Sequence, residues 1–368
     1  MSNQFPLDSS QYQQLHCIGG SSDADIFLAR CIPNNKLVAI KEYDLEATNI
    51  PISKISKEVS SWSTLTHPNA VKYYGSFTFG SKIWVIIECI DGGSLSDILK
   101  DFYPNGIQNE ILIATIFQKV LLFLDYFHSQ QQMHRNLKTN KILISMKGEV
   151  KICGFCDVST LIQSGNRKTS RKSVLESSFY SAPEVIINEQ TKHGYTQSAD
   201  IWNLGIIAIE VATGKVPFYG MNPVEQIKAI TSSNPPTLPS NFSSDFIDFV
   251  SQCLVKDPEK RATAHKLLKH NFIQQAKDEQ YIETLLTSQL PPLIQRYEIR
   301  DQKKNAAVKE NINAMAKRYD FDLPNAPSDH HSDDDSEKGK PKSLEIPSPR
   351  SSKRVKKGRF MISFVHPE

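Results

Sequence analysis

The chain has 368 residues and a formal net charge of +3, so its overall charge gives no reason to expect nucleic-acid binding. Hydrophobic residues make up 39% and charged residues 23% of the sequence, which excludes a fibrous or fully disordered protein. The length allows one large two-lobed domain, or two ordinary domains, followed by a tail.

No targeting signal is visible in the first residues, MSNQFPLDSSQYQ. They contain neither the apolar core of a secretory signal nor a glycine at position 2 for myristoylation. The most apolar run, 111–127, is interrupted by Gln118, Lys119 and Asp125, which predicts a buried helix rather than a membrane span. The six cysteines show no framework spacing, so we expect reduced thiols and a cytoplasmic protein.

The predicted elements change in character along the chain. Short β-type runs in the first hundred residues lie at 27–30, 37–43, 70–77 and 82–89, with one helical stretch at about 50–65. Amphipathic helices then follow at about 110–129, 198–213, 223–231, 243–254 and 263–270, separated by Pro- and Gly-marked turns. A small β-rich lobe followed by a larger helical lobe predicts a two-lobed α+β fold.

The C-terminal residues have a different composition. The stretch 328–358 has hardly any apolar side chains, so it cannot offset the entropy lost on ordering and is predicted to be a disordered tail. The last residues, GRFMISFVHPE, are apolar again, which is typical of a docking peptide.

Several short motifs follow one another along the chain. They are VAIK at 38–41, Glu58 nine positions before His67 of HPN, HRNLKTNK at 134–141, SAPE at 181–184, DIWNLG at 200–205 and Arg261 in DPEKRAT. The sequence therefore resembles the protein kinase superfamily over about residues 11–273, and the resemblance implies that Arg261 pairs with Glu184.

This resemblance implies a division of the chain into four parts. These are an N-terminal extension (1–10), a kinase-like domain (11–273, with an N-lobe of about 11–90 and a C-lobe of about 91–273), a helical extension (274–318) and a disordered regulatory and docking tail (319–368).

The resemblance also implies a nucleotide site. Its expected residues are Ile18, Gly19, Ile26, Ala39, Lys41, Glu58, Glu88 and Leu143. Ser21 replaces the second glycine of the Gly-rich loop, and its side chain limits the approach of the backbone to phosphates, which predicts reduced nucleotide affinity. Lys41 and Glu58 are expected to pair, either around a bound ATP or as a purely structural ion pair.

Three positions that carry phosphoryl-transfer chemistry in kinases are altered. The aspartate that accepts the substrate hydroxyl proton is Asn136, which has no usable basicity near pH 7. The metal-binding asparagine is Lys141, and the aspartate of the DFG motif is Gly154. No catalytic residue is therefore expected, and these three are degenerate positions.

The same changes predict that no metal site is present and that magnesium does not bind, because magnesium prefers oxygen ligands in octahedral geometry. Asp157 is the next acidic side chain after Gly154, but the chain would have to slip for it to replace the lost carboxylate. Cys153 and Cys156 form a C-x-x-C pair that could suggest zinc or redox chemistry, yet no second pair completes a zinc set.

Side chains that stack in a closed kinase are kept as bulky residues: Trp62, Tyr73, His134 and Phe155. Packing without chemistry predicts an inactive pseudokinase, not an enzyme, that acts as an allosteric partner or scaffold and can still bind ATP. The alternative is a serine/threonine kinase with weak residual phosphotransfer. A further hypothesis is that the Lys141 ammonium replaces part of the metal charge and permits metal-independent ATP binding.

Within the superfamily, the sequence resembles the sterile-twenty group, both its fray and oxidative-stress-responsive kinases and the pseudokinase STRAD. The resemblance rests on HPNAVKYYGSF (67–77), DGGSLSDILK (91–100), IEVATGKVPF (209–218), DPEKRAT (257–263) and LLKHNFIQQAK (267–277). By this resemblance, Ser173 in the activation segment and Ser348 in the tail are possible phosphosites.

The resemblance also implies partners for the tail. Tyr319 and Phe321 are similar to an aromatic docking element for an armadillo-like scaffold, and Arg359, Phe360 and Ile362 match a short kinase-docking peptide. We therefore expect an active protein kinase of the same group as a partner and an armadillo-like scaffold as a possible one, with no nucleic acid and no membrane.

Overall fold

The computed structural model describes residues 5–20, 24–47, 50–154, 179–191 and 196–318. The chain divides into two units, Met1–Ile299 and Arg300–Glu368, and the lobes and the site described below belong to the first. The second unit contains the later part of helix α12 (Leu293–Arg318). The predicted disordered stretch 328–358 lies outside the described residues.

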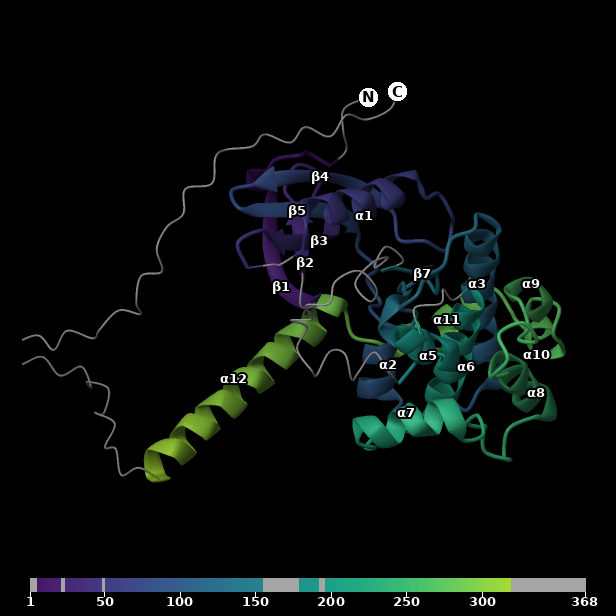
Figure 1. Ribbon diagram of the computed structural model, residues 1–368. Helices are drawn as coiled ribbons and strands as arrows, with labels where there is room; N and C mark the ends of the chain where they lie inside the picture. The colour runs from purple at the N-terminus through teal and green to yellow at the C-terminus, as the bar shows by residue number, and fades with distance from the viewer. Residues whose placement is uncertain (1–4, 21–23, 48–49, 155–178, 192–195, 319–368) are drawn as a thin grey trace, which may run out of the picture. The chain divides into compact units, whose positions relative to one another are not determined.

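The N-lobe is built on an antiparallel sheet with one helix beside it (Figure 1). The strands, in the order β1-β2-β3-β5-β4 across the sheet, are β1 (Tyr12–Gly20), β2 (Asp25–Cys31), β3 (Leu37–Asp44), β5 (Lys82–Glu88) and β4 (Tyr73–Phe79). Helix α1 (Ile52–Thr64) lies between β3 and β4 in sequence and buries Ile55, Val59 and Trp62. These residues are spaced three or four apart, so they share one face of the helix.

The C-lobe is mainly helical, as Figure 1 shows. Its helices are α2 (Leu95–Phe102), α3 (Glu110–Ser129), α5 (Pro183–Thr191), α6 (Ser198–Thr213), α7 (Pro223–Ser232), α8 (Ser244–Cys253), α9 (Ala264–Leu267), α10 (Asn271–Gln274) and α11 (Glu279–Leu285). A hairpin of β6 (Ile142–Ile144) and β7 (Val150–Ile152) precedes α5, and short 3-10 turns lie at Ser9–Gln11, Thr139–Lys141 and Thr287–Gln289. The predicted two-lobed α+β fold is confirmed.

Polar residues fix where several of these helices begin. The side chains of Ser94, Asn109 and Ser243 accept hydrogen bonds from backbone amides in the first turns of α2, α3 and α8. Asn222 does the same for α7 and forms a capping box with Glu225. Each cap satisfies amides that have no partner inside the helix, so the sequence sets these boundaries locally.

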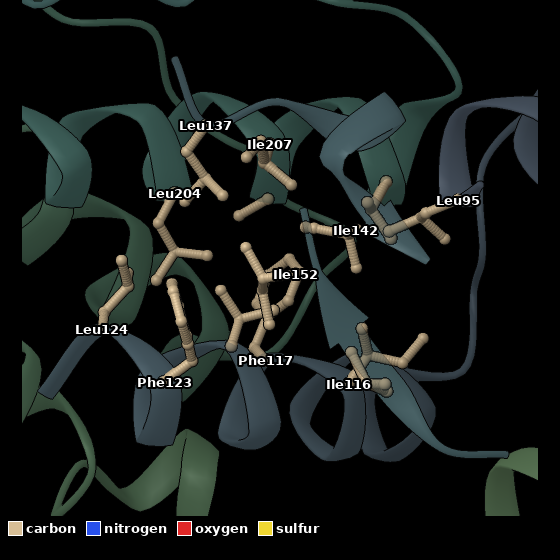
Figure 2. Close-up of a cluster of buried hydrophobic side chains, with 14 of the residues drawn as sticks. Leu95, Ile116, Phe117, Phe123, Leu124, Leu137, Ile142, Ile152, Leu204 and Ile207 are labelled. Carbon is tan, nitrogen blue, oxygen red and sulfur yellow. The ribbon is translucent and has the colours of Figure 1, made fainter. Parts of the chain in front are cut away.

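Helix α3 is the centre of the C-lobe core. It is the one helix in the described part of the chain that is long and apolar enough to cross a membrane, but 67% of its apolar window is buried inside the protein. Figure 2 shows Phe117 and Phe123 of α3 packed near Ile152 of β7 and Leu204 of α6. The predicted buried helix at 110–129 is therefore confirmed.

Hydrogen bonds to β7 hold the two lobes together. The Val71 amide donates to the Ile152 carbonyl (3.0 Å), the Ile152 amide donates to the Asn69 carbonyl (2.7 Å), and the Asn69 side chain donates to the Val150 carbonyl (2.9 Å). The residue after β7 is Cys153, next to Gly154. The interlobe contact thus fixes the backbone on which one of the altered positions lies.

Candidate functional site

The ion pair expected between β3 and α1 is formed. Lys41 Nζ lies 2.5 Å from Glu58 Oε1, and both side chains are nearly buried, with 13% and 11% of their surfaces exposed. Glu58 Oε2 accepts a second hydrogen bond from the Tyr43 hydroxyl (2.8 Å). Both carboxylate oxygens of Glu58 are therefore engaged, which fixes where the Lys41 ammonium lies.

Tyr43 contributes to this arrangement in two ways. Its ring lies beneath the Lys41 ammonium, with Nζ 4.9 Å from the ring centroid, in a cation–π contact. Burial, together with the nearby Glu58 carboxylate, raises the pKa of Tyr43 well above its usual range, although Lys41 opposes the shift. The hydroxyl is therefore protonated at neutral pH and able to donate to Glu58.

The apolar residues expected to contact a nucleotide belong to one cluster. Ala39 is part of the main hydrophobic core, and Ile18, Ile26 and Leu143 are partly buried and pack against it. The main core is therefore continuous from β1, β2 and β3 of the N-lobe to β6 of the C-lobe. Gly19 is exposed, and a Cβ atom built on it would meet nothing within 4 Å, so packing does not require glycine there.

Glu88 is positioned differently from the other expected nucleotide residues. Its carboxylate accepts a hydrogen bond from the Lys72 amide (3.1 Å) and lies 3.8 Å from Lys151 Nζ. Its own amide donates to the Lys72 carbonyl (2.9 Å). The Glu88 side chain thus links β5 to the start of β4 and to β7, which gives it a structural role in addition to its place at the end of β5.

The start of the catalytic loop is held by Asp200, the first residue of the DIWNLG motif. Asp200 is fully buried at the start of α6 and accepts from the His134 amide (2.7 Å), the Arg135 amide (2.8 Å) and His128 Nε2 (2.9 Å). Arg135 has φ +69°, a conformation that a non-glycine residue adopts only when its surroundings enforce it. Asp200 supplies part of that enforcement.

The ionisation of Asp200 follows from these contacts. Burial alone would raise the pKa of its carboxyl group, but the hydrogen bond and charge of His128, with a smaller contribution from His134, hold that pKa below its usual value. The carboxylate is therefore charged at neutral pH and accepts from all three donors.

The middle of the loop is fixed by packing and by a polar group. Leu137 is fully buried and lies beside Leu204 and Ile207 of α6 in Figure 2. Thr139 donates to Glu210 of α6 (3.1 Å), which also accepts from the Tyr180 hydroxyl. Burial raises the pKa of Glu210, although Tyr180, Thr139 and the charge of Lys138 oppose the rise.

Lys138 is a residue that sequence reasoning missed. It is half-buried, and its charge acts on Glu210. The sequence did indicate a role for Lys138, because this residue lies two positions after Asn136 within the catalytic loop. A second lysine in this loop raises the local positive charge beyond that of Lys141 alone.

Lys141 and Gly154 are brought together by the β6–β7 hairpin. The hairpin pairs Ile142 with Ile152, so Lys141 lies opposite Cys153, and the Cys153 amide donates to the Lys141 carbonyl (3.0 Å). Gly154 has φ +75°, and a Cβ built on it would lie 2.8 Å from Lys141 Nζ. The Lys141 side chain therefore occupies the space into which an aspartate at position 154 would extend.

The charge at the altered positions is unfavourable for magnesium. Within the described parts of the chain, no three histidine, cysteine or acidic side chains gather at a point that could hold a metal ion. An ammonium group at the altered positions repels a divalent cation and offers it no oxygen ligand.

Asp157 and Cys156 lie outside the described residues. Trp62, Tyr73 and His134 are well packed, while Phe155 also lies outside them.

The end of the activation segment is locked to the C-lobe. Arg261 is fully buried and forms two hydrogen bonds to Glu184, NH1 to Oε1 (2.6 Å) and NH2 to Oε2 (3.0 Å). It also donates to the Ser198 carbonyl (2.8 Å) and stacks on Trp202, 5.2 Å from the ring. The pairing of Arg261 with Glu184 expected from the motifs is therefore present.

Several predicted positions lie outside the described residues. They are the possible phosphosites Ser173 and Ser348 and the docking residues Tyr319, Phe321, Arg359, Phe360 and Ile362.

Comparison with known proteins gives the same assignment as the fold. Residues 12–273 match the family model "Protein kinase domain". The chain is 36% identical over 310 residues to "Serine/threonine-protein kinase fray2" of Dictyostelium discoideum, covering 83% of this chain and 30% of that protein. It is 34% identical over 345 residues to "Germinal center kinase 3" of Caenorhabditis elegans, covering 88% and 57%.

A shorter relative is covered more fully. The chain is 40% identical over 269 residues to "Serine/threonine-protein kinase ppk11" of Schizosaccharomyces pombe, covering 73% of this chain and 83% of that protein. By contrast, it spans only about a third to just over half of the length of the fray2 and germinal center kinase 3 proteins.

These comparisons correct one prediction from the sequence. The prediction that the chain is not an enzyme is wrong, because several relatives at 36–40% identity are named serine/threonine-protein kinases. Physically, the loss of carboxylates at 136 and 154 argues only against metal-dependent transfer with a carboxylate base. It does not remove the groups that bind and orient phosphates, such as Lys41. The chain belongs to the protein kinase family.

Proposed function

Starting from that family membership, we propose that the protein is a serine/threonine kinase that transfers phosphate slowly, through a site in which the Lys141 ammonium takes over part of the role of a metal ion. The observation that carries the proposal is the placement of Lys141 Nζ in the space in front of Gly154. The formed Lys41–Glu58 pair supports it, because that pair fixes a second ammonium in the same site.

The reaction proposed is the transfer of the γ-phosphoryl group of ATP to a serine or threonine hydroxyl. A bond forms between the hydroxyl oxygen and phosphorus, the bond from phosphorus to the bridging oxygen breaks, and ADP leaves with the electron pair. The hydroxyl proton passes to water. Because the transition state is loose, its main demands are alignment and charge neutralisation.

Asn136 slows this reaction without abolishing it. General-base catalysis contributes on the order of 10²–10⁴-fold, so losing the base lowers the rate by an amount within that range. The Asn136 amide follows His134 and Arg135, whose amides are fixed by Asp200, so the loop keeps a defined path. An amide at this position can still hold a hydroxyl group in place by hydrogen bonding.

In the proposed reaction, three lysine side chains neutralise the negative charge of the phosphates. Lys41 comes from β3, while Lys138 and Lys141 come from the catalytic loop and its end. A lysine ammonium 4 Å from a phosphate charge contributes on the order of 4 kcal/mol at an effective dielectric of 20. A point charge lacks the fixed coordination geometry of a metal ion, so it neutralises the phosphates but orients them less well.

The choice of serine and threonine as acceptors follows the relatives, whose printed names describe serine/threonine-protein kinases. Nothing in the described site selects the acceptor sequence. A partner kinase of the same group, an armadillo-like scaffold and a cytoplasmic location stay predictions, as do phosphorylation of Ser173 and Ser348.

The experiment is a radiolabelled phosphotransfer assay on the full chain, with serine/threonine and tyrosine peptide pools, in excess chelator and in excess magnesium. We expect slow transfer to the serine/threonine pool that persists in chelator and falls about tenfold or more in Lys141→Met. Asn136→Ala should transfer phosphate more slowly than the wild-type protein, because the hydrogen bond to the acceptor hydroxyl is lost.

Two controls make the result decisive. Lys147→Met removes an exposed lysine from the β6–β7 turn and should leave transfer unchanged. Lys41→Met, purified in the same way, reports any contaminating kinase, because it removes the ammonium that Glu58 orients. Incorporation in the wild-type protein no greater than in Lys41→Met would overturn the proposed function.

A further inference from the structure

The folded unit extends beyond the part that matches the kinase family. The match ends at residue 273, but the first compact unit continues to Ile299. Near its end, Thr287 donates to the Met146 carbonyl of the β6–β7 turn (2.8 Å), which anchors the segment on the C-lobe. The chain then enters α12, whose first residues reach the N-lobe.

The start of α12 is buried against the sheet. Leu293 and Tyr297 are 7% and 9% exposed and form an apolar cluster with Leu28 of β2, which is fully buried. Leu15, Ile18, Leu37, Cys89 and Ile294 are partly buried and pack against this cluster. The contact therefore includes β1, β2, the start of β3 and the first residue of the connection between the lobes.

The connection between the lobes, residues 89–94, is also held directly. Arg296 is 6% exposed, and its NH2 donates to the Gly92 carbonyl at 2.5 Å. The neighbouring Gly93 has φ +84°, and a Cβ built there would lie 3.0 Å from Leu293 Cδ1. The backbone of the connection and the first turn of α12 are therefore in close contact, and glycine at 93 permits it.

Tyr297 contacts a nucleotide-site residue. Its hydroxyl donates to the Ile18 carbonyl (3.1 Å), and its ring lies 6.5 Å from that of His16 in a stacked arrangement. In the pairing of β1 with β2, Cys17 lies opposite Phe27 and Gly19 opposite Ile26, so Ile18 falls in a bulge without a partner of its own. A bulge loosens a strand locally, and the Tyr297 hydroxyl binds β1 at that point.

We propose that Leu293–Tyr297, here called the hinge strap, is a positioning element of the nucleotide site. It ties the bulge of β1 to the connection between the lobes, and so sets the height of Ile18 and Gly19 above a bound nucleotide. Tyr297 and Arg296 act as positioning residues, because they touch the backbone that would contact ATP and not the reacting atoms. The part of this inference that concerns ATP rests on the proposed function, whereas the restraint on β1 does not.

The test compares Tyr297→Phe with Tyr281→Phe in the full chain. Tyr281 of α11 offers a matched control, because its hydroxyl makes a single hydrogen bond, with the Asn109 side chain (3.2 Å), inside the C-lobe. The first measurement is amide hydrogen exchange in β1. We expect exchange of β1 amides to become about fivefold faster in Tyr297→Phe and to stay unchanged in Tyr281→Phe, the amount expected from one lost hydrogen bond.

The second measurement is the Kd for ATP by calorimetric titration of the same proteins. We expect the Kd to rise up to about fivefold in Tyr297→Phe only. Equal β1 exchange in the two variants would overturn the strap itself. Faster exchange with an unchanged Kd would overturn its role in nucleotide positioning. If the wild-type protein binds no ATP, the proposed function fails, and the exchange result alone then decides whether the strap restrains β1.

Discussion

Two regions of the kinase domain differ in the contacts that their charged groups make. The buried framework, made of Glu184, Asp200 and Arg261, consists of charged groups that hydrogen-bond to one another or to backbone amides. The phosphate end, made of Lys41, Glu58, Lys141 and Gly154, contains the Lys41–Glu58 pair and, in Lys141, a second ammonium at a position where kinases have a metal-binding group. The shape of a kinase site and its chemistry are therefore fixed by different residues and can change separately.

The difference has a physical basis in burial. A charge without its partner in the framework would be destabilising by several kcal/mol, because no water replaces the lost contact. At the phosphate end, Lys141 is only half-buried and lies where a ligand must enter, so a changed charge at this position alters binding and transfer with little effect on folding. A substitution in one region can therefore be compared with its effect on the other, through stability for the framework and phosphotransfer for the phosphate end.

The largest effect is expected from Arg261→Ala. This change leaves Glu184 without its two hydrogen bonds and removes the stacking on Trp202, so the free energy of unfolding should fall by about 3–5 kcal/mol. Chemical denaturation measures it. The neighbouring Lys260→Ala removes an exposed pair with Asp257 and should change stability by less than about 0.5 kcal/mol. Equal effects of the two changes would contradict the assignment of Arg261 to the framework.

Lys41→Met tests the phosphate end. Phosphotransfer should fall about 100-fold, because the ammonium oriented by Glu58 is lost. The melting temperature, measured alongside, shows whether the variant is folded under the assay conditions. Lys82→Met is the matched control, because Lys82 makes an equally short ion pair with Glu42 (2.5 Å) on the same sheet. A comparable loss of transfer in Lys82→Met would indicate a general effect of N-lobe ion pairs rather than a role for Lys41 in the site.

Asp200 provides a test of the framework by pH. Its pKa is lower in the folded protein than in the unfolded chain, so its contribution to stability is complete well above the unfolded value of 3.8 and is lost as the pH falls through the folded pKa. Asp200→Asn should lower the free energy of unfolding by about 2 kcal/mol at pH 7. The difference from wild type should narrow below about pH 4. A difference that does not vary with pH would show that the carboxylate charge is unimportant there.

The double variant Lys141→Asn with Gly154→Asp tests the charge at the phosphate end. It removes the Lys141 ammonium and supplies a carboxylate and an amide, both of which are magnesium ligands. Phosphotransfer in this variant should become dependent on magnesium, with about a tenfold difference between magnesium and chelator. Aspartate tolerates the positive φ at position 154 better than most residues do. Gly154→Asp alone is the control, because Lys141 would then pair with the new carboxylate and keep magnesium out.

Sequence reasoning predicted the elements that local rules govern. The Lys41–Glu58 pair, the Arg261–Glu184 pair and the helix at 110–129 each follow from motifs or from periodicity within one segment. Strand β1 was not identified as a strand, because its polar side chains and the glycines at its end give no alternating pattern. The contact of Lys141 with Gly154 depends on the register of the β6–β7 hairpin, which pairs residues six to ten positions apart.

The hinge strap shows a second reason why sequence was not enough. Residues after 290 were interpreted mainly from their growing charge, although Leu293, Ile294 and Tyr297 share one helical face. That face packs against Leu28, more than 260 residues earlier in the chain, and no local pattern reveals such a partner. Enzymatic character was also misjudged, because absent carboxylates were equated with absent activity. A lysine that could supply charge was treated only as a hypothesis.

The most direct test of the account is a calorimetric titration of the full chain with ATP in excess chelator, repeated with Lys141→Met and with Lys147→Met. We predict that the wild-type protein and Lys147→Met bind ATP without a divalent metal, and that Lys141→Met binds it about tenfold or more weakly. Binding that requires magnesium in the wild-type protein, or that is unaffected by Lys141→Met, would contradict the claim that the Lys141 ammonium takes over part of the role of the metal.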